Sequence, residues 1–360
     1  MKFDFAVKEY DYNLRDGNLN SEAKGVVKSK KDFPYFIDDG KKIIFKPLSR
    51  TKPLSTPYFA YSEVVWSTIL NNYFDRNIPI YILAKCHGYQ NEVLKYHDYG
   101  TVVESLVKDD EKLVNLYEFF RDNPDPNVKI DDYINYCLMY YDYSFFFDTD
   151  FIKNNPQLGK EIARQYLYSV LRADQNYHYE NVSFIYKNNK LESVAKPIDH
   201  EFSTMFMYLD QIDEHKGLFS EYINLMSINM NSLDDKVKIL FESLPEDKKC
   251  LLTPTILNNI KKIAKLYPDL IQEFSTCLGN LINDLQTEPI ILENYSYIEP
   301  FSSEDYKEGI LRFKENNSLE ADAVHKKLER KYVDPSLVSE RINDEIIEAA
   351  KVLKKKLDNN

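Results

Sequence analysis

The sequence predicts an α+β protein in two lobes: a small, strand-rich amino-terminal lobe, residues 1–105, and a large, mainly helical carboxyl-terminal lobe, residues 106–360. Short apolar runs that alternate with polar residues, a pattern typical of strands, are concentrated in the first lobe. In the second, apolar residues recur at spacings of three and four, which is typical of amphipathic helices. The chain has 360 residues, 43% of them hydrophobic and 29% charged, which is an ordinary composition for globular domains.

The smaller lobe is expected to contain strands, one helix and a hairpin. Residues 58–74 include no glycine or proline, so their helical spacing is uninterrupted. In chain order, we expect strands at 3–8 and 42–46, a helix at 58–74, and strands at 78–86 and 92–98 that form a hairpin around a turn at 88–91.

The larger lobe is expected to be helical, with one interruption. Helical spacing predicts helices at 109–121, 130–147, 157–171, 216–228, 232–244, 254–266 and 271–285, and a last helix that starts at Pro335. The interruption covers residues 172–203. There a polar loop, a strand, a tight turn at 187–190 and a second strand lead to Asp199.

Composition and charge exclude several classes of function. Only 9 glycines occur, and neither G-x-x-x-x-G-K-[ST] nor G-x-G-x-x-G is present, so a glycine-rich phosphate loop is excluded. The net charge of −12 disfavours direct binding of nucleic acid. The four cysteines show no metal or disulfide spacing. Since no apolar run is long enough for a membrane span or a signal core, we expect a cytoplasmic protein with no membrane association, and secretion without a signal stays open.

The interruption carries residues that suit phosphoryl transfer. This reaction needs an aspartate that orients the attacking hydroxyl, oxygen ligands for Mg²⁺, and a lysine on the nucleotide phosphates. Asp174 and Asn181 share one loop, and Asp199 follows the hairpin, which would bring it back beside that loop. Asn181 and Asp199 provide the kind of oxygen ligands that Mg²⁺ takes when phosphates and water complete its coordination.

The smaller lobe supplies further candidate residues. Lys46 ends an apolar strand, where a phosphate-binding lysine is expected, and Glu63 in the next helix is expected to hold it through an ion pair. In the loop at 47–57, hydroxyls such as that of Ser49 would cover the phosphates together with backbone N–H groups. Taken singly, a surface lysine, a polar helix face or a helix cap explains each residue. Their order along the chain favours a nucleotide site.

On these residues the chain resembles the HipA-like serine/threonine kinases of bacteria. The resemblance rests on Ile43-Ile-Phe-Lys46-Pro, Ser62-Glu63-Val-Val, Arg172-Ala-Asp174, His178-Tyr-Glu-Asn181 and Pro197-Ile-Asp199-His-Glu-Phe-Ser. It implies a two-lobed protein-kinase-like fold, ATP and Mg²⁺ as cofactors, and transfer of phosphate to a Ser or Thr hydroxyl of a protein. The toxin members of the family pair with a small helix-turn-helix antitoxin, so a toxin-like or effector-like role and such a partner are expected.

The resemblance also implies a role for each residue of the site. Asp174 would be the catalytic base. His178 in the same stretch of sequence either orients the catalytic loop or is an ordinary packed loop histidine. Lys46 would contact ATP, and Asn181 and Asp199 would bind the metal.

One departure from the family pattern concerns the catalytic base. The base usually lies roughly five residues before the metal-binding asparagine, whereas Asp174 lies seven residues before Asn181 and Asn176 lies five before it. Either residues 176 and 177 are an insertion, which we favour because both halves of the pattern then remain, or Asn176 occupies the base position. Asparagine cannot accept the proton, so the second alternative implies an inactive kinase. A pseudokinase that acts by binding, and a kinase for a small-molecule or lipid hydroxyl, stay open.

Overall fold

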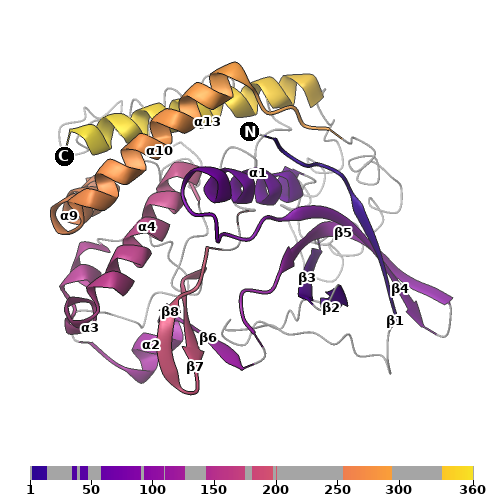
Figure 1. The fold of residues 1–360 in the computed structure, drawn as a ribbon, viewed down its shortest axis with the longest axis horizontal. Helices are drawn as coiled ribbons and strands as arrows, with labels where there is room; N and C mark the ends of the chain where they lie inside the picture. The colour runs from indigo at the N-terminus through magenta and orange to yellow at the C-terminus, as the bar shows by residue number, and fades with distance from the viewer. Residues whose placement is uncertain are drawn as a thin grey trace, which may run out of the picture.

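A computed structural model describes residues 2–13, 35–38, 41–47, 58–90, 93–108, 110–125, 143–174, 181–197, 200, 254–293 and 335–359. The predicted fold class is confirmed in this part of the chain: a strand-rich half is followed by a mainly helical one (Figure 1). None of the helices described is long and apolar enough to cross a membrane.

The larger sheet has five strands, β1 (Lys8–Asn13), β2 (Tyr35–Asp38), β3 (Lys41–Pro47), β4 (Ile82–Gln90) and β5 (Val93–Glu104). Their order is β1-β4-β5-β3-β2, with β1 parallel to β4 and the other neighbours antiparallel. The predicted hairpin is present as β4 and β5, but residues 88–90 belong to β4 and not to the turn. The first strand begins later than predicted, at Lys8, and Phe5 of the expected strand packs its ring on Tyr61, 5.5 Å between centroids.

Helix α1 (Tyr58–Tyr73) lies between this sheet and the long helix α10 (Pro268–Thr287) (Figure 1). Every residue of α1 from Phe59 to Leu70 is buried. A helix that is apolar on all sides is typical of such an interior position. The prediction of a helix at 58–74 is confirmed, and its few polar side chains must find their partners inside the protein.

A second, smaller sheet consists of β6 (Glu111–Asn115), β7 (Ser183–Lys187) and β8 (Lys190–Val194), all antiparallel. The predicted hairpin around residues 187–190 is confirmed, with Asn188 and Asn189 at φ of 51° and 59° in its turn. Asparagine tolerates this left-handed conformation, which two-residue hairpin turns require.

The helix predicted at 109–121 is wrong in its first half. Residues 111–115 form β6, because they pair with β7, whose residues lie about seventy positions later in the chain. Helix α2 (Leu116–Asp122) starts only at Leu116, where the side chain of Asn115 accepts a hydrogen bond from the Glu118 N–H at 2.7 Å. This cap marks the true start of the helix.

The helical half otherwise follows the prediction only in part: the helices expected at 157–171, 254–266, 271–285 and from Pro335 are confirmed, but a short helix at 150–154 was not predicted and the end of the one expected at 130–147 is a 3-10 helix. It contains the 3-10 helix η3 (Tyr143–Asp148) and helices α3 (Asp150–Asn154), α4 (Pro156–Arg172), α9 (Pro254–Leu266), α10 and α13 (Pro335–Asp358). Four of these helices begin with proline, whose fixed φ suits the first helical position. The helices expected at 216–228 and 232–244 lie outside the described residues, as does most of the one expected at 130–147.

One hydrophobic core extends across both halves of the molecule. It includes Trp66 and Leu83 from the strand-rich half, and Leu167, Phe274 and Ile346 from helices α4, α10 and α13. In Figure 1, α10 and α13 lie side by side above α1. The domain boundary at residue 105 falls just after the end of β5 and stays a prediction, because the core is continuous there.

Candidate active site

The alternation of β3 directs Lys46 toward α1. Ile44 packs against the main core, whereas Phe45 points to the opposite face of the sheet, into a small cluster with Ala84 and Val102. Since side chains alternate between the two faces of a strand, Lys46 lies on the same face as Ile44. Its ammonium group there forms an ion pair with the carboxylate of Glu63 in α1.

The Lys46–Glu63 pair is buried. The Lys46 side chain is 14% exposed and that of Glu63 is 2% exposed. A charge in such surroundings is stable only when it is paired and its remaining hydrogen-bonding capacity is used. The second oxygen of Glu63 accepts a hydrogen bond from the backbone N–H of His200 at 2.8 Å. The lysine and glutamate that the sequence assigns to one ion pair are therefore brought together, along with a third residue.

His200 is fully buried and is held from several elements. The hydroxyl of Ser62 donates to the His200 carbonyl oxygen at 2.5 Å, and the ring of Tyr81 contacts the imidazole edge to face, 5.7 Å between centroids. Arg172 donates to Nδ1 of the imidazole ring. A guanidinium group has only donors, so Nδ1 accepts and the ring proton is on Nε2.

Sequence reasoning missed His200. His200 shows no metal-ligand spacing in the sequence, which therefore predicts no role for it. In the sequence, His200 lies between Asp199 and Glu201, and these charged neighbours give no sign that it is buried.

The backbone has an unusual conformation between the end of α4 and Asp174. Ala173 has a left-handed φ of 49°, which is uncommon for a residue other than glycine. The N–H of Asp174 then donates to the Ser169 carbonyl oxygen at 3.0 Å, so the backbone turns sharply after the helix. The carboxylate of Asp174 accepts a hydrogen bond from Arg172 at 2.6 Å, and both side chains are only 2% exposed.

These contacts form one continuous polar chain, Lys46–Glu63–His200–Arg172–Asp174, which we call the buried relay. It joins the central part of the larger sheet, α1, the residue after Asp199 and the end of α4. Each charged member has an oppositely charged neighbour within the relay, which is what burial of charge requires.

The remaining predicted residues are placed only in part. Asn181 lies two residues before β7, half-buried at the start of the hairpin. The neighbouring Val182 carbonyl oxygen accepts a hydrogen bond from the Leu116 N–H at 2.9 Å, which ties the hairpin to α2. Ser49, His178 and Asp199 lie outside the described residues, as does Asn176, so the pairing of Asn181 with Asp199 stays a prediction. In the described part of the chain, no three His, Cys, Asp or Glu side chains form a metal-binding group.

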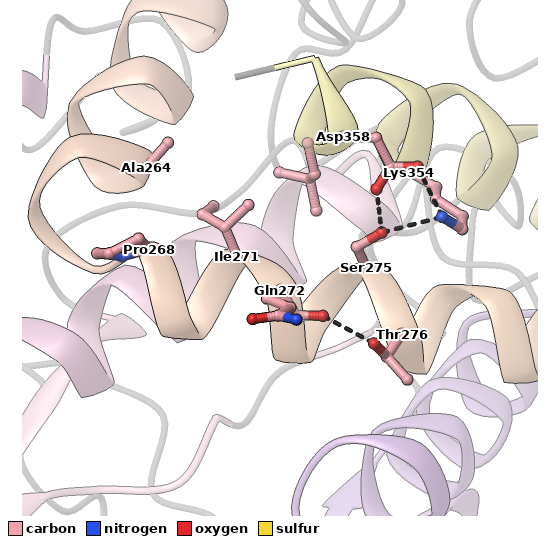
Figure 2. A pocket seen from close by; sticks show the side chains of 9 residues that line it. Ala264, Pro268, Ile271, Gln272, Ser275, Thr276, Lys354 and Asp358 are labelled. Carbon is pink, nitrogen blue, oxygen red and sulfur yellow. Dashed lines mark hydrogen bonds and ion pairs between the residues drawn. The ribbon is translucent and has the colours of Figure 1, made fainter.

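A separate polar cluster lies where the end of α13 meets α10 (Figure 2). The Ser275 hydroxyl donates to Asp358 and accepts from Lys354 at 3.0 Å, beside a hollow of about 440 Å³. The hydrogen bond from Lys354, followed by that from Ser275, holds the pKa of Asp358 below its ordinary value. Because these three side chains satisfy one another, we interpret the cluster as a contact that anchors the last turn of α13.

Comparison with known proteins gives little similarity. No model of a known protein family matches the chain, and no curated protein matches it. Among solved structures, a similar chain is the Helicobacter pylori proinflammatory kinase CtkA. It is 14% identical, the match covers 82% of this chain and 93% of that chain, and the TM-score is 0.36. At this TM-score the likeness supports no conclusion about function.

Proposed function

We propose that this protein is an ATP- and Mg²⁺-dependent phosphotransferase, and that its acceptor is a Ser or Thr hydroxyl of a protein. The observation that carries the proposal is the buried Lys46–Glu63 pair, whose glutamate also bonds the backbone of His200. A strand lysine, a helix glutamate and the residue after Asp199 are thereby linked. Such a linkage is expected where a lysine must be held in position for nucleotide phosphates.

The chemistry asked of the site is mainly positioning and charge stabilisation. Lys46 would bind phosphate oxygens, and Glu63 would restrict the lysine to one orientation. A side chain that is already ordered loses less conformational entropy when it binds a ligand, so this restriction would strengthen binding. Asn181 and Asp199 would hold Mg²⁺, which neutralises charge on the phosphates when bound. A site with one or two protein oxygen ligands fits this ion, because phosphates and water complete its coordination.

A second candidate function, nucleotide binding without transfer, is favoured by the surroundings of Asp174. A catalytic base must come within hydrogen-bonding distance of the acceptor hydroxyl. Asp174 is almost fully buried, and Arg172 occupies one of its carboxylate oxygens. The residue five positions before Asn181 is Asn176, which cannot take up a proton. A protein with these features would bind ATP and act through its partners.

The HipA-like assignment, a toxin-like or effector-like role and a helix-turn-helix antitoxin partner rest on the motif resemblance alone. The choice of acceptor is equally open to experiment, because a small-molecule or lipid hydroxyl would use the same residues.

The test is transfer of labelled γ-phosphate from ATP in the presence of Mg²⁺, with ATP binding measured separately. The variants are Asp174→Asn, Asn176→Asp, Asp199→Asn and Lys46→Met. Lys41→Met is the matched control, because Lys41 lies in the same strand but forms an exposed pair with Glu104. Loss of transfer in Asp174→Asn, Asp199→Asn and Lys46→Met, but not in Lys41→Met, supports the kinase. ATP binding with transfer only in Asn176→Asp identifies a pseudokinase. A wild-type protein that binds no ATP contradicts both.

A further inference from the structure

We propose that His200 and Arg172 are positioning residues that make the binding of ATP at this site depend on the metal ion. The inference rests on the proposed function and adds two residues to it. His200 is the residue directly after Asp199 and is held by α1, and Arg172 joins His200 to the end of α4.

The described contacts use both backbone groups of His200. Its N–H donates to Glu63 at 2.8 Å, and its carbonyl oxygen accepts from Ser62 at 2.5 Å. Both partners belong to α1, in which every residue from Phe59 to Leu70 is buried. The N–H of His200 shares one planar peptide unit with the carbonyl group of Asp199. Holding His200 therefore restricts where the backbone of Asp199 can lie.

Arg172 has two partners within the buried relay. One terminal nitrogen donates to His200 Nδ1 and the other donates to the Asp174 carboxylate at 2.6 Å. The planar guanidinium group fixes the angle between these two hydrogen bonds, which a lysine ammonium group would not do. Arg172 thus holds the His200 side chain and the start of the candidate catalytic loop in one geometry.

An alternative explanation is that these residues only stabilise the core. The two explanations differ in what the variants change. A purely stabilising cluster would lower the free energy of unfolding and leave the metal dependence of ATP binding unaltered. A positioning role predicts that the metal-dependent part of ATP affinity is lost in folded protein.

The experiment measures the dissociation constant of ATP by calorimetry on the full chain, with Mg²⁺ and with EDTA. The variants are His200→Leu, which removes the acceptor, His200→Asn, whose Oδ1 can accept from Arg172, and Arg172→Lys. Arg164→Lys is the matched control, because Arg164 lies on the same helix and pairs with Glu161 and Glu273 outside the buried relay.

We expect His200→Leu and Arg172→Lys to lose at least tenfold in affinity with Mg²⁺ and less than twofold with EDTA. His200→Asn should recover most of the loss, and Arg164→Lys should behave as wild type. If His200→Leu does not fold, the comparison of Arg172→Lys with Arg164→Lys decides. The inference is overturned if folded His200→Leu or Arg172→Lys keeps the full effect of Mg²⁺, or if His200→Asn loses as much as His200→Leu.

A second measurement separates failure of this inference from failure of the proposed function. A double-mutant cycle of Glu63→Gln and Arg172→Lys on the unfolding equilibrium, followed by fluorescence of the buried single tryptophan, Trp66, needs no ATP. Linkage through His200 predicts a coupling of at least fivefold, which persists in the His200→Asn background, where an acceptor for Arg172 remains, and disappears in the His200→Leu background. If the wild type binds no ATP and the coupling is present, the proposed function fails alone. If the coupling is absent, the inference fails whatever ATP does.

Discussion

Removal of the Glu63 charge is expected to destabilise the protein strongly. In Glu63→Gln the side chain keeps its shape and one oxygen that can accept from the His200 N–H. The Lys46 ammonium group, which is 14% exposed, then loses the negative charge of Glu63 beside it. The electrostatic change is therefore confined to one charge in a largely buried place, and the substitution leaves no cavity.

The magnitude follows from that burial. Removing one partner of a buried ion pair costs about 3–5 kcal/mol. Because Lys46 keeps some contact with water, we expect about 3 kcal/mol, at the lower end. The double variant Lys46→Met/Glu63→Gln removes both charges and should be more stable than Glu63→Gln alone by more than about 1 kcal/mol. In the control Glu104→Gln, the pair with Lys41 is 51% and 60% exposed, and a loss below about 1 kcal/mol is expected.

The assay is urea unfolding at neutral pH, followed by the fluorescence of Trp66 in α1. The midpoint and slope together give the free energy of unfolding. If Glu63→Gln costs no more than Glu104→Gln, or if the double variant is as unstable as the sum of its parts, the pair is effectively solvated. The Lys46–Glu63 pair would then make no large contribution to the packing of β3 on α1.

Three further predictions concern other contacts. Gly100→Ala should lower the free energy of unfolding by about 1–3 kcal/mol and weaken ATP binding. The reason is that a Cβ at this position collides with the Lys46 carbonyl oxygen and the Phe45 ring. Urea unfolding measures the first effect and calorimetry the second. Burial raises the pKa of Asp75, but hydrogen bonds from Lys196 and Asn77 outweigh it and hold the pKa below its ordinary value of 3.8. Asp75→Asn should therefore be less stable than wild type above about pH 4, and the difference should vanish as the pH falls through the lowered pKa; unfolding curves across pH that stay parallel would contradict this. Ile346→Ala should lower the free energy of unfolding by about 2–5 kcal/mol, since Ile346 of α13 is fully buried in the main core. A loss within about 0.5 kcal/mol, as for a surface substitution, would show that α13 is not part of the cooperative fold.

Several elements follow from local sequence alone. Helices α1, α4, α9, α10 and α13 were predictable because apolar spacing and a proline or cap at the start act within a few turns of the chain. The β7–β8 hairpin was predictable for the same reason, since Asn188 and Asn189 favour its tight turn. These features depend on residues that are near neighbours in sequence.

The errors have the opposite origin. Residues 111–115 have a helical spacing but form β6, because β7 offers them hydrogen-bonding partners far along the chain. Phe5 sits in an alternating pattern but packs on Tyr61 instead of joining a strand. In both cases a contact with a distant residue outweighs the local preference, which amounts to roughly a fraction of a kcal/mol per residue. The spacing of residues in the sequence does not reveal such a distant partner.

The candidate site divides in the same way. A lysine at a strand end and a glutamate near the start of the next helix were visible in the sequence, and they meet because the strand and the helix are adjacent along the chain. His200 was not visible, because its partners Ser62, Tyr81 and Arg172 come from separate parts of the chain. Whether a polar residue is buried and bonded depends on which elements surround it, and that depends on packing across the whole core.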